Sequence, residues 1–309
     1  MHVALYFHGR LPVRGYGGTQ RVVVWLARGL AELGHQVTLL APVGSSVPEA
    51  NLIALDPSGM RRPEFDLTAL LPGSIDILHA HAPLVTSPAR PHLFTLHGNL
   101  GADRTPQPNT VFLSADHARR HGGTAFVYNG VDPGEFDFRA TKNDYDLFLG
   151  RLHSIKGYRW AIEGAKRVGR PLVIAGGWRP TFRRGLRFVG SVDGARKAEL
   201  LANAACLWMP ALWDEPFGLT LVEAMMSGTP VLGTTRGALP EIVTDKVGAL
   251  GDTLEDLVRL RPAIERCEPE ACRAHAKRWF SHRVMAEEYV RMYRLYLANG
   301  SLPPGRRVL

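Results

Sequence analysis

The densest group of residues with chemical potential in this chain lies between Asp214 and Pro230. Glu215 stands in a loop that runs through Gly218 into a predicted helix, and Glu223 falls in the first turn of that helix. Backbone N–H groups at a helix start, together with the helix dipole, attract anions such as a diphosphate. Two plainer interpretations stay open. Glu223 could complete a capping box with Thr220, and Glu215 could be an ordinary loop carboxylate.

A second candidate group lies between another predicted strand and helix, in the segment Gly150–Gly157. Its two cations, Arg151 and Lys156, stand where both could clamp the same diphosphate. The alternative is a pair of solvated cations at a turn.

Glycines also follow the first predicted strand, where Gly17 and Gly18 open a helix and let the backbone approach a phosphate. The loop is not a dinucleotide fingerprint, because Gln20 occupies the third glycine position. The second strand also ends in Ala41-Pro42, without the acid that would bind a ribose. A nicotinamide-dependent dehydrogenase is therefore disfavoured.

Three histidines lie at the ends of two predicted strands or just after them. His79 and His81 would share one face of a strand, which could begin a metal site, although no third ligand is evident nearby. His97 stands beside Gly98 at the carboxyl end of a strand, a good position to touch a substrate. A buried structural histidine is the alternative for His97. We expect no metal and no cofactor to be required.

Length and composition restrict the class of protein. The 309 residues allow two domains of roughly 150 residues each. With 45% hydrophobic and 21% charged residues, a mostly disordered chain is excluded. No apolar run approaches the ~18 residues of a membrane span, and Met1–Phe7 lacks the features of a signal peptide. The three cysteines form no even disulfide framework, which indicates a reduced, cytoplasmic compartment.

The chain is basic, with a formal net charge of +8 and a pI of about 9.7. The basic residues are scattered in small clusters and form no stripe interleaved with aromatics, so nucleic acid is not an expected partner. Solvated faces, an anionic small substrate, or peripheral contact with the inner face of a membrane would each explain the surplus.

Short apolar runs alternate with helical patterns, which predicts βαβ units and parallel sheets. In the first half, a helix over Gly18–Leu33 places Val23, Leu26 and Leu30 on one stripe. The predicted strands of this half are Val3–Phe7, Gln36–Ala41, Leu52–Leu55, Ile75–His79, His92–Leu96, Val111–Ser114 and Ala125–Tyr128.

The pattern restarts after a turn-rich linker, Asn129–Thr141. The second set of predicted strands is Tyr145–Leu149, Pro171–Ala175, Arg187–Val189, Cys206–Met209 and Pro230–Gly233. Its predicted helices are Lys156–Val168, Ala195–Ala204 and Leu221–Ser227, and a last helix, Phe280–Asn299, is long enough to cross back to the first half.

These elements predict two Rossmann-like, doubly wound domains that face a cleft. We expect an N-terminal Rossmann-like domain over residues 1–135 and a C-terminal Rossmann-like domain over 136–282. The helix over 283–299 would pack on the first domain, and residues 300–309 would form a loose tail.

Taken together, the motifs resemble glycosyltransferase family 4, whose members are retaining, nucleotide-sugar-dependent enzymes of the GT-B fold. The similar segments follow in family order from about residue 1 to 245: Gly17-Gly18, Thr95–Gly98, Asn129–Asp132, Gly150–Gly157 and Glu215–Val231. The loop containing Tyr16 resembles antibiotic-tailoring members of the family.

The resemblance implies transfer of a sugar from a nucleotide-diphosphate sugar, UDP being the expected carrier, to a small-molecule, glycan or lipid-linked acceptor. Arg151 and Lys156 would bind the diphosphate, and Glu223 the ribose. Val192 belongs to the segment beside the base. His97 and Glu215 are the candidate catalytic residues. The donor sugar and phosphate would also be held by the backbone of Phe217, Gly218, Leu219 and Thr220.

The physical chemistry of the reaction agrees with these assignments. Cleavage of a sugar–diphosphate bond leaves negative charge on the phosphate, and cations and helix N–H groups aimed at it should contribute most. The sequence shows no carboxylate pair to activate an acceptor from the opposite face of the sugar, so the anomeric configuration should be retained. An epimerase or sugar phosphorylase of the same fold, or a non-catalytic nucleotide or nucleic-acid binder, are the competing hypotheses.

Overall fold

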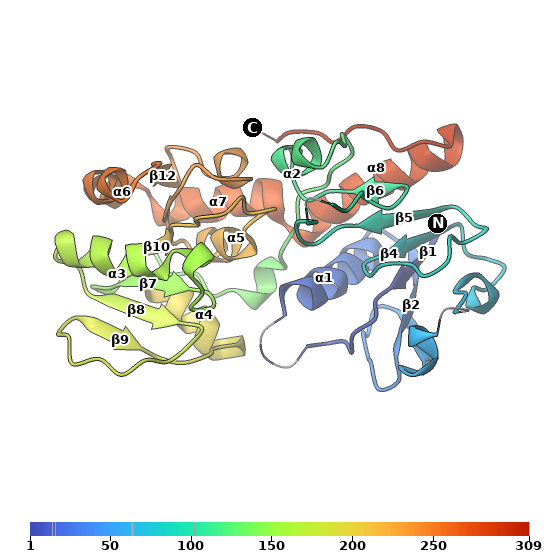
Figure 1. Cartoon of the computed structure of the whole chain (residues 1–309), viewed down its shortest axis with the longest axis horizontal. Helices are drawn as coiled ribbons and strands as arrows, with labels where there is room; N and C mark the ends of the chain where they lie inside the picture. The colour runs from blue at the N-terminus through green and yellow to red at the C-terminus, as the bar shows by residue number, and fades with distance from the viewer. Residues whose placement is uncertain (14, 16, 63–64, 102, 309) are drawn as a thin grey trace. The chain divides into compact units, whose positions relative to one another are not determined.

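The computed structural model describes residues 1–13, 15, 17–62, 65–101 and 103–308. The chain divides into two compact units (Figure 1). Unit 1 consists of Met1–Val131 together with His282–Arg307, and unit 2 is formed mainly by Asp132–Ser281. The last helix is therefore part of the N-terminal unit.

Unit 1 is built on a six-stranded sheet with the order β3-β2-β1-β4-β5-β6, in which every strand pairs in parallel. The order reverses between β1 and β4. In doubly wound sheets, ligands bind beyond the carboxyl ends of the strands at such a reversal. The strands are β1 (His2–Tyr6), β2 (Gln36–Pro42), β3 (Asn51–Leu55), β4 (Ile77–Ala80), β5 (His92–Thr95) and β6 (Thr110–Val111).

In unit 1, a helix from the N-terminal part of the chain packs against the last helix of the chain. The predicted first helix is confirmed as α1 (Gly18–Glu32), and α8 (His282–Asn299) packs against it (Figure 1). A Cβ atom at Gly29 of α1 would lie 2.7 Å from the carbonyl oxygen of His282, so glycine is needed for this close approach. The prediction that the last helix returns to the first domain is therefore confirmed.

Three sequence predictions for unit 1 are wrong. The predicted strand Val111–Ser114 ends early because Ser114 caps α2 (Ala115–Arg120), a helix that we did not predict. Ala125–Tyr128 pairs only through an isolated bridge from Phe126 to Phe112, since β6 offers an edge of two residues.

The third incorrect prediction is that residues 300–309 form a loose tail. The Gly305 N–H donates to the Thr124 carbonyl over 2.9 Å, and Arg291 of α8 donates to the Pro304 carbonyl over 3.2 Å. A Cβ atom at Gly305 would lie 2.3 Å from the Phe126 ring. Glycine at this position therefore lets the tail lie directly on unit 1.

Unit 2 repeats the same topology with a second six-stranded parallel sheet, in the order β12-β11-β10-β7-β8-β9. Its order reverses between β7 and β10. The strands are β7 (Asp146–Leu149), β8 (Leu172–Ala175), β9 (Leu186–Phe188), β10 (Cys206–Met209), β11 (Val231–Gly233) and β12 (Gly248–Leu250). The predicted fold class, with two Rossmann-like domains, is confirmed.

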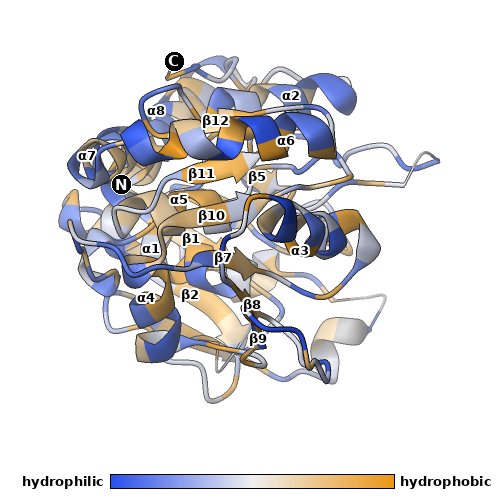
Figure 2. Cartoon of the chain, turned by 90° about the vertical axis from the view of Figure 1, so that its left-hand side faces the viewer, coloured by the Kyte–Doolittle hydropathy of each residue, from blue (hydrophilic) through white to orange (hydrophobic). Residues whose placement is uncertain are grey.

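Helices cover the sheet of unit 2: α3 (Tyr158–Arg167), α4 (Gly194–Asn203), α5 (Leu219–Met226), α6 (Leu254–Leu260) and α7 (Pro269–Phe280). The strands carry mainly hydrophobic colours in Figure 2, and hydrophilic residues mark the outer sides of α3 and α6. Between the layers, Phe148, Trp208 and Leu232 form the centre of a buried cluster. We did not predict β12, α6 or α7. The predicted helix from Phe280 begins at His282, because α7 ends at Phe280 and Ser281 is extended.

Candidate active site

The reversal point of unit 2 brings two loops together that are far apart in the sequence. The loop Gly150–Gly157 follows β7, and the loop from Pro210 to Gly218 follows the neighbouring strand β10. The Leu212 N–H donates to the Ile155 carbonyl over 2.7 Å. Gly157 has φ +72°, and a Cβ atom there would lie 1.7 Å from the Pro210 carbonyl oxygen. Only glycine allows the two loops to close in this way.

Where these loops meet, Lys156 and Glu215 form an ion pair. Lys156 Nζ lies 2.6 Å from Glu215 Oε2, and Trp213 Nε1 donates to the same oxygen over 2.9 Å. The ammonium group also lies 4.5 Å from the centroid of the Trp213 ring. The two charged side chains are only 17% and 11% exposed. The alternative of a solvated cation is therefore wrong for Lys156, and Glu215 is a loop carboxylate with fixed cationic and N–H partners.

The backbone behind Glu215 is also fixed. The Ala238 N–H donates to the Glu215 carbonyl over 2.9 Å. A Cβ atom at Gly237, where φ is +64°, would come within 2.4 Å of the Glu215 backbone nitrogen. The loop after β11 thus holds the backbone of Glu215 in place.

Helix α5 begins immediately after this pair. Its N-cap is Gly218, with φ +88°, and no side chain caps the helix. The N–H groups of Leu219 and Thr220 at the helix start have no intrahelical acceptor, which is the condition for anion binding. Phe217 is buried with its ring 6.0 Å from that of Phe280, and so anchors the turn before the helix. Four of the predicted donor-binding residues thus stand in one turn.

Glu223 does not complete a capping box with Thr220, because α5 begins at Leu219 and Glu223 lies in its second turn. Its Oε1 atom instead lies 2.6 Å from Lys197 Nζ, and the two side chains are 5% and 10% exposed. We missed Lys197. A signal was present, since Lys197 stands four residues before the buried Leu201 and so on the apolar face of α4.

Two further predicted site residues lie at the same edge of the sheet. Arg151 is exposed in the first turn after β7. Val192 is half-buried in the loop after β9, which is joined to the end of β8 by a 2.7 Å hydrogen bond from the Gly176 N–H to the Gly190 carbonyl.

The glycine loop of unit 1 also opens a helix, as predicted. Gly17 is the N-cap of α1 in an extended conformation, and Gly18 is the first helical residue. A Cβ atom at Gly17 would lie 2.7 Å from Gln20 Oε1, so the turn is packed tightly. Tyr16, on which the similarity to antibiotic-tailoring enzymes rests, lies outside the described residues.

The histidines meet at the carboxyl edge of the sheet of unit 1. His81 Nδ1 and His97 Nε2 share a 2.9 Å hydrogen bond, and the His79 and His81 rings lie 4.0 Å apart, which confirms their common face. Burial lowers the pKa of His97 to about 3. Burial, followed by the neighbouring histidines, also holds the pKa of His79 and His81 well below the usual value. All three rings are therefore neutral at physiological pH.

Within its described residues, the structure does not bring together the ligands for a metal site at His79 and His81. His79 binds the Tyr293 hydroxyl through Nδ1 at 2.6 Å and the Thr95 hydroxyl through Nε2 at 2.7 Å, so both ring nitrogens are occupied. Across the described part of the chain, no three His, Cys, Asp or Glu side chains are placed to hold a metal ion. His79 therefore ties the sheet to α8.

One Asp-x-Asp sequence, Asp144-Tyr145-Asp146, is present in the chain. Asp146 is fully buried and accepts hydrogen bonds from Trp208 at 2.8 Å and from Arg261 at 2.6 and 2.8 Å. Asp144 is paired with Arg170 at 2.6 Å. Asp146 thus serves the buried packing of unit 2, whereas Asp144 forms an ion pair at its surface.

Two doubly wound units, of which the second carries cations and an uncapped helix start at its reversal point, form the GT-B architecture of the glycosyltransferases that the chain resembles in structure. Family models match both halves: "Glycosyltransferase Family 4" over residues 16–132 and "Glycosyl transferases group 1" over residues 145–265. AviGT4, a glycosyltransferase involved in Avilamycin A biosynthesis, is 30% identical, with a TM-score of 0.78 over 98% of this chain and 99% of that one. The chain belongs to glycosyltransferase family 4.

Other relatives agree with this class. A phosphatidyl-myo-inositol mannosyltransferase of Mycobacterium leprae (strain TN) is 27% identical over 92% of this chain and 95% of that protein. The structure of Anabaena Alr3699/HepE in complex with UDP and glucose shares the fold, with 16% identity and a TM-score of 0.66 over 94% of this chain and 98% of that one. The chain is thus a glycosyltransferase of the hexosyltransferase type. In the described residues, no helix combines the length and apolar character needed to span a bilayer.

Proposed function

We propose that this enzyme transfers a sugar from a UDP-sugar to a hydroxyl group of a small-molecule, glycan or lipid-linked acceptor, with retention of the anomeric configuration. The Lys156–Glu215 pair beside the start of α5, at the reversal point of unit 2, is the observation that carries the proposal. The complex of the Anabaena neighbour with UDP and glucose supports the choice of UDP. The relative involved in Avilamycin A biosynthesis supports a small-molecule acceptor, and the phosphatidyl-myo-inositol mannosyltransferase supports a lipid-linked one.

In this proposal the leaving diphosphate is bound by Lys156, Arg151 and the N–H groups at the start of α5. Charge that develops on the leaving oxygen is stabilised by groups already held in position, which is the largest contribution such a site can make. Glu215 holds the Lys156 ammonium over 2.6 Å and would orient the donor sugar. Glu223 would bind the ribose, and Val192 would lie beside the base.

His97 would contact the sugar as a neutral imidazole. Its Nε2 atom is shared with His81, so the hydrogen bond fixes the orientation of the ring. A neutral ring can hydrogen-bond to a sugar hydroxyl without adding positive charge near the anomeric carbon, where positive charge develops.

Retention is supported by the state of the two carboxylates. Glu215 is paired with Lys156, and Glu223 with Lys197. Neither pairing suits a general base that activates an acceptor from the opposite face of the sugar, which inversion requires. We also propose that the enzyme acts in the cytoplasm, with peripheral contact at the inner face of the membrane, and that it needs no metal or other cofactor.

The test begins with a thermal-shift screen of nucleotide sugars, because a ligand that binds the folded state raises the melting temperature. The donor found in this way is then incubated with acceptors, and the anomeric configuration of the first product is read by proton NMR. We expect an α-linked product from an α-linked donor. A β-linked product would contradict retention, whereas epimer formation without acceptor, or dependence on inorganic phosphate, would select the alternative activities.

A further inference from the structure

The connection between β8 and β9 is short for two parallel strands. Residues 176–185 join them without a helix, although parallel strands are usually linked by a crossover of a dozen or more residues that includes one. The preceding crossover, from β7 to β8, does contain a helix, α3. The missing helix leaves part of the sheet beside α3 uncovered.

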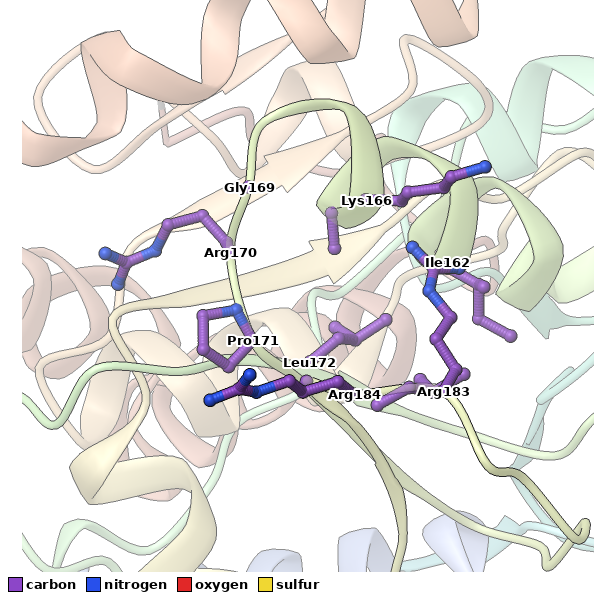
Figure 3. Close-up of a pocket in the computed structure, with 11 residues that line it drawn as sticks. Ile162, Lys166, Gly169, Arg170, Pro171, Leu172, Arg183 and Arg184 are labelled. Carbon is purple, nitrogen blue, oxygen red and sulfur yellow. The ribbon is translucent and has the colours of Figure 1, made fainter.

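The uncovered face forms a pocket of about 530 Å³ (Figure 3). Its apolar lining comes from Ile162 and Ala165 of α3 and from Leu172 and Leu186. The two leucines are the first residues of β8 and β9, so the pocket lies at the amino ends of these strands. The candidate active site lies at the opposite, carboxyl edge of the same sheet.

All charged residues that line this pocket are basic: Lys166, Arg170, Arg183 and Arg184. Arg170 is paired with Asp144 at 2.6 Å, which leaves Lys166, Arg183 and Arg184 as the source of the positive surplus. In Figure 3, Arg184 extends along Pro171 and Arg183 toward Ile162. The carboxyl end of α3 adds only partial negative charge, so an anion would be attracted by the side chains.

Two exposed aromatic side chains stand in the same connection. Phe182, next to Arg183 in the chain, is 106% exposed, and Trp178 is 68% exposed. Among the described residues, these are the two most exposed large hydrophobic side chains. A soluble anion would give these rings no apolar contact. Aromatic rings beside arginines are typical of segments that bind at a membrane surface, where rings enter the headgroup region and cations meet lipid phosphates.

We propose that this pocket and the connection 176–185, called here the β8–β9 surface, dock the enzyme on an anionic phospholipid bilayer. Lys166, Arg183 and Arg184 would bind the lipid phosphate, while Phe182 and Trp178 enter the interface. The cations surround one pocket and do not follow a groove, which favours a headgroup over a nucleic-acid backbone. The inference deepens the peripheral membrane contact proposed above by naming the surface that makes it, and it does not depend on the transfer reaction.

Co-sedimentation with phosphatidylcholine vesicles, with and without phosphatidylglycerol, tests the proposal. We expect binding to the phosphatidylglycerol vesicles that weakens as salt is raised. Each cation near such a surface contributes about 1 kcal/mol, so the double variant Arg183→Ala/Arg184→Ala should bind roughly 30-fold more weakly. The double variant Phe182→Ser/Trp178→Ser should also lose binding. Both should keep the wild-type melting temperature, because these side chains are at the surface.

The matched control is Arg306→Ala/Arg307→Ala, which removes the same charge from an exposed pair on unit 1. We expect this control to bind like the wild type. Equal losses in the two arginine variants would overturn the assignment of the site, and no binding to phosphatidylglycerol vesicles would overturn the proposal. Binding of glycerol phosphate or of a single-stranded oligonucleotide without vesicle binding would show that the pocket serves a soluble anion or a nucleic acid.

Discussion

The two units share one strand order but present different chemistry at the carboxyl edges of their sheets. In unit 1 the edge carries the neutral pair His81 and His97, above a buried network of His79, Thr95 and two tyrosines. In unit 2 it carries two ion pairs, Lys156–Glu215 and Lys197–Glu223. The same scaffold therefore supports either kind of site, and the loops after the strands decide which.

The proposed reaction breaks the bond between a sugar and a diphosphate, and the two sites differ in the way that the charges developing on these two groups require. Negative charge that builds on a leaving diphosphate needs cations held in place by partners of their own, and unit 2 supplies these. The sugar becomes positively charged, so a neutral ring such as His97 is the better neighbour. Substitutions that remove the charge pairs should therefore act differently from those that alter the histidines.

The largest expected effect is on the stability of unit 2. Glu223→Ala leaves the Lys197 ammonium buried without its carboxylate and should lower the free energy of unfolding by about 3–5 kcal/mol. The double variant Lys197→Met/Glu223→Leu removes both charges and should recover most of this loss, but not the nucleotide affinity if Glu223 binds the ribose. Urea unfolding and nucleotide titration measure the two effects. An unchanged free energy of unfolding in Glu223→Ala would contradict the role of this pair in the fold.

A somewhat smaller effect is expected from Glu215→Gln, which keeps the shape of the side chain but removes the charge that holds Lys156. Misplacing a reacting group by about an ångström can cost 100-fold in rate, and we expect a loss of turnover of that order. The melting temperature should stay near that of the wild type. Glu199→Gln, on the exposed ion pair with Arg196, is the matched control and should be fully active. Wild-type turnover in Glu215→Gln would remove the Lys156–Glu215 pair from the mechanism.

The two ion pairs also show what the sequence alone could not predict. The strands could be predicted because buried parallel strands read as continuous apolar runs, such as Leu147–Leu149 and Leu172–Ala175. Lys156 and Glu215 were both singled out, but 59 positions separate them, and their contact follows only from β7 and β10 being neighbours. The Lys197–Glu223 contact depends on how α4 packs on α5, which no local pattern encodes. Short elements such as α2 and β12 carry too few residues to show a period.

A further effect concerns acid, and it should separate the units. Burial lowers the pKa of His97 and of His117 to about 3, below the ~6.5 of an unfolded chain. Each histidine therefore stabilises unit 1 fully above pH 6.5, and this stability is lost as the pH falls toward 3, by up to ~1.4 kcal/mol per pH unit. Hydrogen exchange read by mass spectrometry should show unit 1 opening before unit 2. His117→Gln should reduce the pH dependence of the stability of unit 1. Opening of both units at the same pH would contradict the expected difference between them.

The central claim is that unit 2 binds the nucleotide diphosphate whereas unit 1 acts on the sugar. Calorimetric titration of UDP into the wild type, Lys156→Ala and His97→Ala, combined with transfer rates, tests it most directly. We predict that Lys156→Ala loses UDP affinity and slows transfer by roughly 100- to 1000-fold. His97→Ala should slow transfer while UDP affinity stays at the wild-type value. Unchanged UDP affinity in Lys156→Ala, or lost affinity in His97→Ala with the fold intact, would contradict the account.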